Sequence, residues 1–215
     1  MSVGIGNKKY ALAVVDEATG WATFCPSSNK DNASVADGLL EHFGNNLSKA
    51  KMFYCDGYSS FKRIAKLLRI PTKYSTPNTP TSNSRQESWM RILGDGIRTL
   101  LYSAGLTSAW WPLAGSYFCN AWNILRVNPR TGKTAFQMRF PNKPVPMLMP
   151  FGSGCTYVPP KVSYAIKSED PPCKVDARGK PAILVRYYLP PGEASNKEFI
   201  IAPLSNFTSK TILLK

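Results

Sequence analysis

Three acidic residues stand where their carboxylates are able to meet at one edge of a folded core. Asp16 and Asp56 each follow a short apolar run, and Glu87 lies in the first turn of a long helical pattern. Acids at strand ends and at a helix start converge at one edge of an α/β sheet. Clustered carboxylates repel one another unless they hold hard cations, and Mg2+ prefers oxygen ligands. The pattern therefore predicts a site for two Mg2+ (or Mn2+) ions that catalyses phosphoryl transfer.

Each of these acids also has a structural interpretation. An Asp at a strand end is often a turn residue, and a Glu in a first helical turn is favoured by the helix dipole. Taken singly, each acid is expected to be structural. Taken together, in a basic chain with few other acids in its core, they favour a site.

The composition excludes several other kinds of chemistry. The chain has 215 residues, of which 43% are hydrophobic, so wholesale disorder is excluded. The only histidine is His42, and the five cysteines contain no C-x-x-C pair, which excludes a structural zinc site and a His-based triad. The cysteines are expected to be reduced, intracellular and mostly buried, and His42 to be a surface or helix-end residue. No run of eighteen apolar residues predicts a membrane span, and no signal-peptide layout opens the chain.

The charge of the chain predicts a polyanionic partner. There are 27 basic and 13 acidic residues, giving a net charge of +14 and a pI near 9.7. The excess runs along the whole length, and residues 128–160 hold four basic residues and no acidic one. Such a charge favours nucleic acid as the partner. The alternative, that the high pI only aids solubility, stays open.

The hydrophobic pattern predicts a mixed α/β fold with a sheet covered by helices. Gly20 lies in a tight turn between the first two strands, while Asn32 and Gly44 are expected to cap and to end the first helix. The aromatic-rich last helix is expected to lie in the core or at a dimer face. Strands are predicted at 9–15, 21–26, 51–57 and 71–76, and helices at 32–44, 59–70, 85–104 and 109–127.

The distribution of prolines divides the chain into three parts. Residues 1–127 carry the α/β pattern and form the predicted core. Residues 128–160 hold seven prolines and predict an extended connector. Residues 161–215 offer short apolar runs separated by turn residues and predict a small all-β module.

Two sequence blocks resemble a retroviral-type integrase core. The first is KKYALAVVDEATGWATFCP (8–26), in which an apolar strand runs into an Asp, and the second is FYCDGYSSF (53–61). A third block is similar to the copia-type LTR-retrotransposon form, with a TP-x-TP loop, an Asn, the catalytic Glu four residues later, a basic helix, Gly-Leu and Trp-Pro. The residues that carry this likeness are Thr76-Pro77, Thr79-Pro80, Asn83, Glu87, Arg91, Arg98, Gly105-Leu106 and Trp111-Pro112. Downstream, the likeness continues through NILRVNPRTGKTAFQMRF, LMPFGSGCTYVPPK and VDARGKPAILVRYYL.

The resemblance implies a ribonuclease-H-like core followed by a small SH3-like β-barrel. It places Asp16, Asp56 and Glu87 at the Asp, Asp, Glu (DDE) positions that bind two magnesium ions. The family joins element DNA to target DNA by transesterification, with the 3′ hydroxyl as the nucleophile. The implied partners are DNA ends and target DNA, with homo-oligomerisation, no membrane, no small-molecule cofactor and a nuclear location.

Basic residues near the three acids are candidates for DNA contact. Arg91 and Arg98 share a helix face with Glu87, although an intrahelical Glu87–Arg91 salt bridge is an equal alternative. Lys73 and Arg85 flank the polar loop. Lys62 and Lys66 lie on the basic face of helix 59–70, for which a solvated face is an equal alternative.

The loops depart from the family pattern at two of the acids. Gly57-Tyr58 follows the second acid where the family usually has Asn-Gly, and Asn83-Ser84 precedes the third. A catalytically inactive, DNA-binding remnant of a retrotransposon polyprotein is therefore the main alternative. A nuclease that cuts without joining and a protein-interaction domain are two others. The sequence begins almost at the first core strand, so a fragment, an isolated coding remnant or a reduced descendant is expected.

Overall fold

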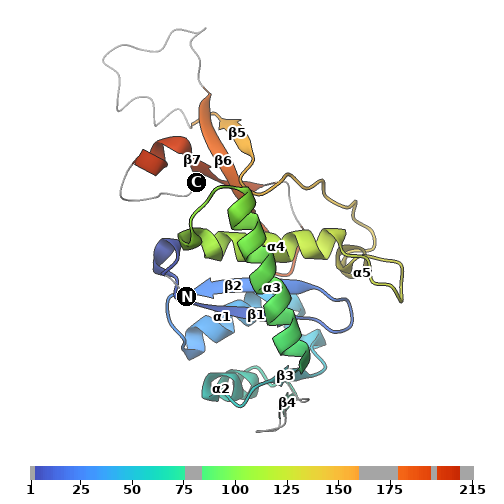
Figure 1. The fold of residues 1–215 in the computed structure, drawn as a ribbon. Helices are drawn as coiled ribbons and strands as arrows, with labels where there is room; N and C mark the ends of the chain where they lie inside the picture. Colours follow the sequence, from blue (N-terminus) through green and yellow to red (C-terminus); the bar gives the residue numbers. More distant parts are fainter. Residues whose placement is uncertain (1–2, 76–83, 160–178, 195–197, 209–215) are drawn as a thin grey trace.

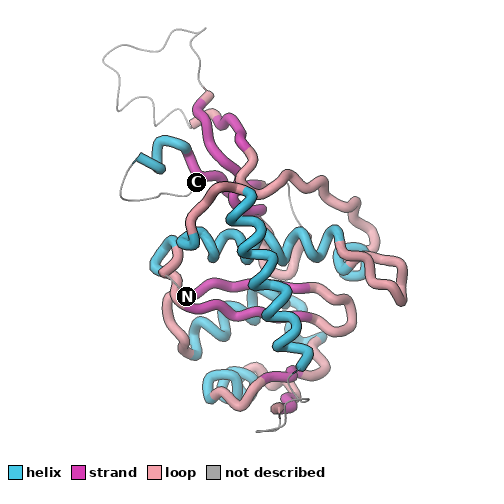
Figure 2. Tube along the Cα trace, viewed as in Figure 1, coloured by secondary structure: helices cyan, strands magenta, loops and turns pink. Residues whose placement is uncertain are grey.

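The computed structural model describes residues 3–75, 84–159, 179–194 and 198–208 and shows a mixed α/β fold (Figure 1). Helices surround small sheets, as Figure 2 shows by colour. Most of the polar loop predicted at 76–84, and the apolar runs at 161–166 and 211–215, lie outside the described residues. No described helix has both the length and the apolar character needed to cross a membrane.

The chain opens with the predicted β-hairpin. Strands β1 (Tyr10–Val15) and β2 (Ala22–Ser27) pair antiparallel, with Tyr10 opposite Ser27. The turn is closed by the Gly20 N–H, which donates to the Asp16 carbonyl at 2.7 Å. Gly20 has a φ of +75°, a conformation that glycine adopts without steric cost. The sequence prediction of the hairpin is thus confirmed.

A second unit packs beside the hairpin. It consists of helix α1 (Asn32–Phe43), strand β3 (Phe53–Cys55), helix α2 (Ser59–Leu67) and strand β4 (Thr72–Tyr74). The N-cap of α1 is Asp31 rather than the predicted Asn32, because the Asp31 carboxylate accepts the Ser34 N–H at 2.9 Å. Gly44 ends the helix as expected.

Two long helices cross the molecule. The predicted helix 85–104 is confirmed as α3 (Ser84–Ser103), and the aromatic-rich helix is α4 (Trp111–Leu125). At Gly96 of α3, an added Cβ would lie 2.1 Å from the Phe118 ring of α4. Glycine therefore lowers the helix propensity of α3 but allows the two helices to approach closely. The short 3-10 helices are η1 (Ile5–Asn7), η2 (Gly44–Lys49), η4 (Ser108–Trp110) and η6 (Leu204–Thr208).

The described core strands form two sheets rather than the single core sheet that the pattern predicts, and strands β5, β6 and β7 form a third. Their orders are β1-β2, β3-β4 and β5-β6-β7, with β3 and β4 parallel. The unit of β3 joins the hairpin through side chains: Val14 of β1 and Leu39 of α1 are buried with Ile64 of α2, and Phe53 of β3 packs against this cluster. No backbone ladder joins β3 to β1 among the described residues, so apolar packing connects the two strands.

The segment predicted to be an extended connector contains secondary structure and core residues. Helix α5 (Ala135–Arg139) opens with a capping box in which Thr134 and Gln137 bond each other's backbone N–H groups. Strand β5 (Gly154–Tyr157) follows, and Phe136 and Phe151 are buried. The prolines lie between these elements, so the segment folds onto the core instead of spanning a gap.

The C-terminal strands share one core with the helices. Strand β6 (Lys180–Tyr187) pairs antiparallel with β5 and with β7 (Phe199–Pro203). Leu184 and Val185 of β6 are buried in the same cluster as Leu93 of α3 and Ala114 of α4. The described residues form a three-stranded sheet here, and the SH3-like barrel remains a prediction.

Candidate carboxylate site at the start of α3

Asp16 is held by its own turn. One carboxylate oxygen accepts the Ala18 N–H at 3.1 Å, and the other accepts the Thr19 hydroxyl at 2.6 Å. The Thr19 hydroxyl in turn accepts the Trp21 N–H at 3.2 Å. The half-buried carboxylate therefore has a fixed position at the end of β1.

Asp56 lies directly after β3 and is exposed. Its carboxylate accepts the Tyr58 N–H at 3.2 Å. The Tyr58 hydroxyl donates to the Lys30 carbonyl at 2.7 Å, and the Lys30 ammonium lies 4.4 Å from the centre of the Tyr58 ring. The turn that carries Asp56 is thus anchored to the segment between β2 and α1.

The start of α3 lies between the other two acids. Glu87 is exposed in its first turn. The first turn of α3 contacts the β1–β2 turn, because the Arg85 guanidinium lies 2.9 Å from the Glu17 carboxylate. It also contacts β3, because the Gln86 amide donates to the Tyr54 carbonyl at 3.3 Å. Figure 1 shows the lower end of α3 beside both elements.

The three acids share a region but do not form a cage in this structure. Among the described residues, no three His, Cys, Asp or Glu side chains are grouped closely enough to hold a metal ion. All three predicted ligands are carboxylates, so the donor chemistry suits Mg2+. Their negative charges repel one another, and Asp16 and Asp56 bond to their own turns instead. The two-magnesium site remains a prediction.

Several of the predicted DNA contacts lie around the same end of α3. Lys73 of β4 is the register partner of Tyr54 in β3, and the Lys62 ammonium lies 5.2 Å from the ring centre of Tyr74. Lys66 is exposed on α2. The neighbouring cation Arg85 is paired with Glu17, as described above.

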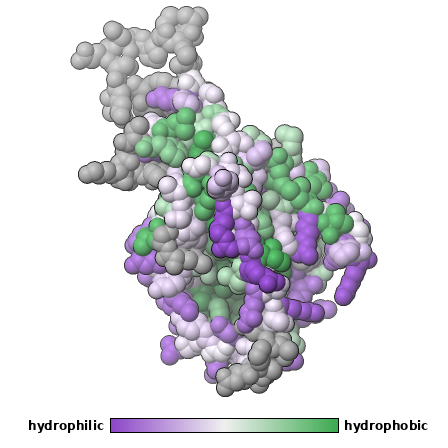
Figure 3. All heavy atoms as spheres, in the orientation of Figure 1, coloured by the Kyte–Doolittle hydropathy of each residue, from purple (hydrophilic) through white to green (hydrophobic). Residues whose placement is uncertain are grey.

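The arginines along α3 differ in their partners. Arg98 pairs with Asp95, whereas Arg91 is exposed and pairs with no carboxylate among the described residues. The alternative Glu87–Arg91 salt bridge is therefore absent from this part of the structure. Figure 3 shows hydrophilic side chains along α3, on the solvent-exposed surface of the molecule.

Sequence reasoning missed the residues that position the acids. Thr19, three residues after Asp16, had a local signal, because Asp and Thr at this spacing often bond within a turn. Tyr58 had none, since its partner Lys30 is 28 residues away. Glu17 and Gln86 also had no local sequence signal, because their contacts join separate elements.

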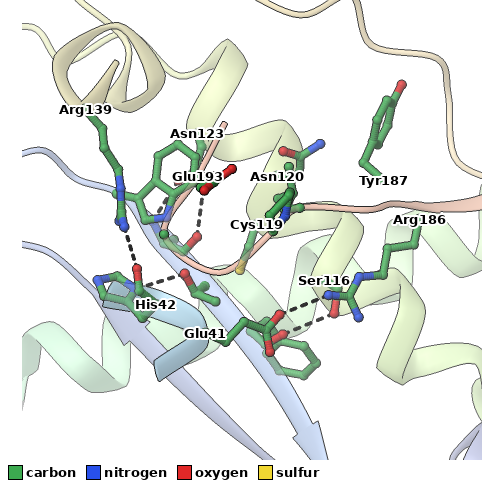
Figure 4. A pocket seen from close by; sticks show the side chains of 17 residues that line it. Glu41, His42, Ser116, Cys119, Asn120, Asn123, Arg139, Arg186, Tyr187 and Glu193 are labelled. Carbon is green, nitrogen blue, oxygen red and sulfur yellow. Dashed lines mark hydrogen bonds and ion pairs between the residues drawn. The ribbon is translucent and has the colours of Figure 1, made fainter. Parts of the chain in front are cut away.

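A second polar cluster lies between the core and the C-terminal sheet. A cavity of about 30 Å³ is lined there by residues that include His42, Asn123 and Arg139. Figure 4 shows these side chains together with the Glu41–Arg186 ion pair, whose charged atoms are 3.0 Å apart. Neither Asp16, Asp56 nor Glu87 lines this cavity, so it is separate from the candidate carboxylate site.

His42 is buried, which corrects the expectation of a surface residue. Only 1% of it is exposed, and its Nδ1 lies 2.9 Å from the Thr23 hydroxyl. Burial lowers the pKa of His42 to about 3; the positive charge of Arg139 adds to this, and the negative charge of Asp16 opposes it. The ring is therefore neutral at physiological pH. Arg139 donates to the His42 carbonyl at 2.5 Å, which satisfies the end of α1.

The solved structures that resemble this chain include retroviral integrases. A chain of the cryo-EM structure of the simian T-cell lymphotropic virus intasome in complex with PP2A regulatory subunit B56 gamma is 16% identical, with a TM-score of 0.49; the match covers 98% of this chain and 71% of that chain. The catalytic core domain of BIV integrase is 17% identical, with a TM-score of 0.45, over 63% of this chain and 87% of that chain. The HTLV-2 integrase catalytic core domain in complex with magnesium, in a trimeric form, is 15% identical, with a TM-score of 0.44, over 62% and 87%.

No protein-family model matches the sequence, and the comparison with curated proteins finds no relative. The copia-type assignment therefore remains a proposal that rests on the residues.

Proposed function

We propose that this protein is a metal-dependent polynucleotidyl transferase of the copia-type integrase kind. It joins the 3′ ends of retroelement DNA to target DNA in the nucleus, as a homo-oligomer. Asp16, Asp56 and Glu87 hold the metal ions. Bound Mg2+ ions would polarise the phosphodiester and lower the pKa of the attacking hydroxyl.

One observation carries the proposal. The first turn of α3 contacts both the β1–β2 turn, through Arg85 and Glu17, and β3, through Gln86 and Tyr54. Each of these contacts lies within two residues of one of the proposed ligands. The fold therefore brings three distant sequence blocks to the same end of one helix, as a shared site requires.

The basic residues around this end have a matching role. Lys62, Lys73 and Arg91 are exposed, and in water-accessible positions their charges attract phosphate groups. Arg85 forms an ion pair with Glu17 in which both side chains are largely exposed, so its remaining donors are open to DNA. These residues position the DNA, and the acids provide the chemistry.

A joining assay tests the proposal. A preformed branched DNA removes the need to pair two ends, and the reaction is run with Mg2+ or Mn2+. The wild type is expected to give metal-dependent joined product, and Glu87→Gln, which keeps the size and removes the charge, to lose it. Glu193→Gln, an exposed acid on the β6–β7 turn, is the matched control and should behave as wild type. Cut product without joined product would identify a nuclease instead.

A DNA-binding remnant is the second candidate. It is favoured by the Asp16 carboxylate, whose two oxygens are both engaged by its own turn. In that case the folded wild type would give no product with either cation, yet would still bind DNA in a salt-sensitive way.

A further inference from the structure

The region from α4 to the end of α5 is unusually basic. No Asp or Glu occurs from residue 96 to residue 168, although the chain contains 13 acids. Within 126–143 there are five basic residues, of which Arg139 is engaged inside the molecule. The other four are exposed, and we call them the basic loop: Arg126, Arg130, Lys133 and Lys143.

The backbone of this loop is closed by its own hydrogen bonds. The Asn128 N–H donates to the Lys133 carbonyl at 2.9 Å, and the Asn128 carbonyl accepts the Gly132 N–H at 2.9 Å. The Asn128 side chain accepts the Arg130 N–H at 2.9 Å. Val127 and Thr134 pair across the base of the loop. Because these bonds fix the backbone of residues 127–134, which carries Arg130 and Lys133, little backbone entropy is lost when these two charges bind a ligand.

Aromatic rings lie beneath two of the cations. The Arg126 guanidinium is 4.0 Å from the ring centre of Trp122, and the Lys143 ammonium is 6.0 Å from that of Phe140. None of the four cations forms an ion pair within the described parts of the chain, whereas Arg85, Arg98 and Arg186 do. The basic loop therefore presents charge that no carboxylate of this region neutralises.

The loop lies on the same edge as the candidate carboxylate site. Trp21 ends the turn that Asp16 begins, and its N–H and carbonyl groups bond within that turn. The Phe140 and Phe136 rings at α5 pack on Trp21, with centroids 5.4 and 6.4 Å away. Figures 1 and 3 show α5 and the β1–β2 turn at the same side of the molecule, where hydrophilic side chains project.

We propose that the basic loop is a second contact surface for the phosphate backbone of duplex DNA. The identification of the polyanion as DNA rests on the proposed function. Guanidinium and ammonium groups on a fixed loop bind phosphates without reading bases, so the contact is independent of sequence. It extends the DNA-binding surface from the start of α3, across the β1–β2 turn, to the far end of α4.

The salt dependence of DNA binding tests this proposal. The double variant Arg130→Ala/Lys133→Ala removes two charges at the tip of the loop. Since each lost phosphate contact lowers the slope of log K against log salt by about 0.9, the slope should fall by about 1 to 2. Affinity at 0.1 M salt should fall about tenfold. Arg130→Lys/Lys133→Arg keeps both charges and should restore the wild-type slope.

The matched control is Lys9→Ala/Lys51→Ala. Both lysines are exposed and precede β1 and β3, so they lie at the opposite strand ends from Asp16 and Asp56. A slope that changes equally in both double variants would overturn the proposal, as would wild-type binding that does not depend on salt. If Arg130→Ala/Lys133→Ala binds DNA as the wild type does but no longer binds anionic lipid vesicles, the proposal of a DNA contact is wrong and the ligand is a membrane surface. If the wild type joins DNA but Arg130→Ala/Lys133→Ala leaves the salt slope unchanged, this inference is wrong and the proposed function stands. If the double variant lowers the slope but the wild type joins no DNA, the proposed function is wrong and this inference stands.

Discussion

At the scale of single residues, Asp16 accepts hydrogen bonds from its own turn and interacts electrostatically with His42 and Arg139. Its own turn donates two hydrogen bonds to the carboxylate. The negative charge also raises the pKa of both His42 and Arg139, against the stronger lowering by burial. These two hydrogen bonds fix the carboxylate at the end of β1, and a metal ion bound there would share its oxygens with the turn.

The buried His42 makes stability depend on pH. Its pKa is about 3 in the folded protein, against an ordinary value of 6.5. Below pH 6.5 the unfolded chain therefore binds a proton that the folded protein does not, and stability falls as the pH drops toward 3. Between pH 7 and pH 5 we expect a loss of about 2 kcal/mol in the free energy of unfolding.

Urea unfolding at pH 7, 6 and 5 measures this loss, with His42→Gln as the comparison. Because His42 is the only histidine, its NMR titration is free of overlap with other imidazoles. A wild type whose stability is the same at pH 7 and pH 5, or a ring that titrates near 6.5, would contradict the account.

At the scale of elements, two glycines allow the end of α1 to contact the β6–β7 turn. An added Cβ on Gly44 would lie 2.3 Å from the Pro191 carbonyl oxygen, and one on Gly192 would lie 2.6 Å from the Phe43 carbonyl oxygen. Both have positive φ angles. The Gly192 N–H also donates to the Glu41 carbonyl at 3.3 Å. Backbone therefore meets backbone at this junction, without room for a side chain.

Gly44→Ala is accordingly expected to lower the free energy of unfolding by about 3 kcal/mol, through both backbone strain and collision. Gly105→Ala is a comparison without collision, because Gly105 has a φ of +64° but no atom within 4 Å of an added Cβ. Its expected cost is about 1 kcal/mol. Denaturant titration of both variants is the measurement, and equal costs would show that no collision occurs at Gly44.

The elements that the sequence predicts well are those with local signals. Gly20 and the short apolar runs on either side of it define the hairpin, and the stripe through Trp89 and Leu101 defines α3. The separation of β3 from β1, the folding of 128–160 onto the core and the burial of His42 depend on contacts between distant residues. The proximity of the three acidic blocks was inferred from topology, but their hydrogen bonds to Thr19 and Tyr58 were not.

At the scale of the whole molecule, one apolar core joins the helices to the C-terminal strands. Leu184 of β6 is 2% exposed and packs in the same cluster as Leu93 and Trp110. All five tryptophans lie within residues 21–122, and although Trp110 also stacks on Phe207, their fluorescence reports mainly on the N-terminal part. A shared core predicts that damage to β6 destabilises that distant part.

Leu184→Ala should shift the tryptophan-monitored unfolding transition by about 3 kcal/mol, the usual cost of a buried leucine. Val158→Ala, at a position 67% exposed, should leave the transition unchanged. A tryptophan transition that does not respond to Leu184→Ala would mean that the C-terminal strands unfold as an independent module.

The central claim is that Asp16, Asp56 and Glu87 act as one metal site. Mn2+ titration of isotope-labelled protein tests it most directly, because the paramagnetic ion broadens the NMR signals of the residues around it. We predict that the signals of all three acids broaden at the same Mn2+ concentration, and that Glu87→Gln removes this broadening at Asp16 and Asp56 as well. Broadening of the Asp16 and Asp56 signals that is unchanged in Glu87→Gln, or that appears first at unrelated acids such as Glu193, would contradict it.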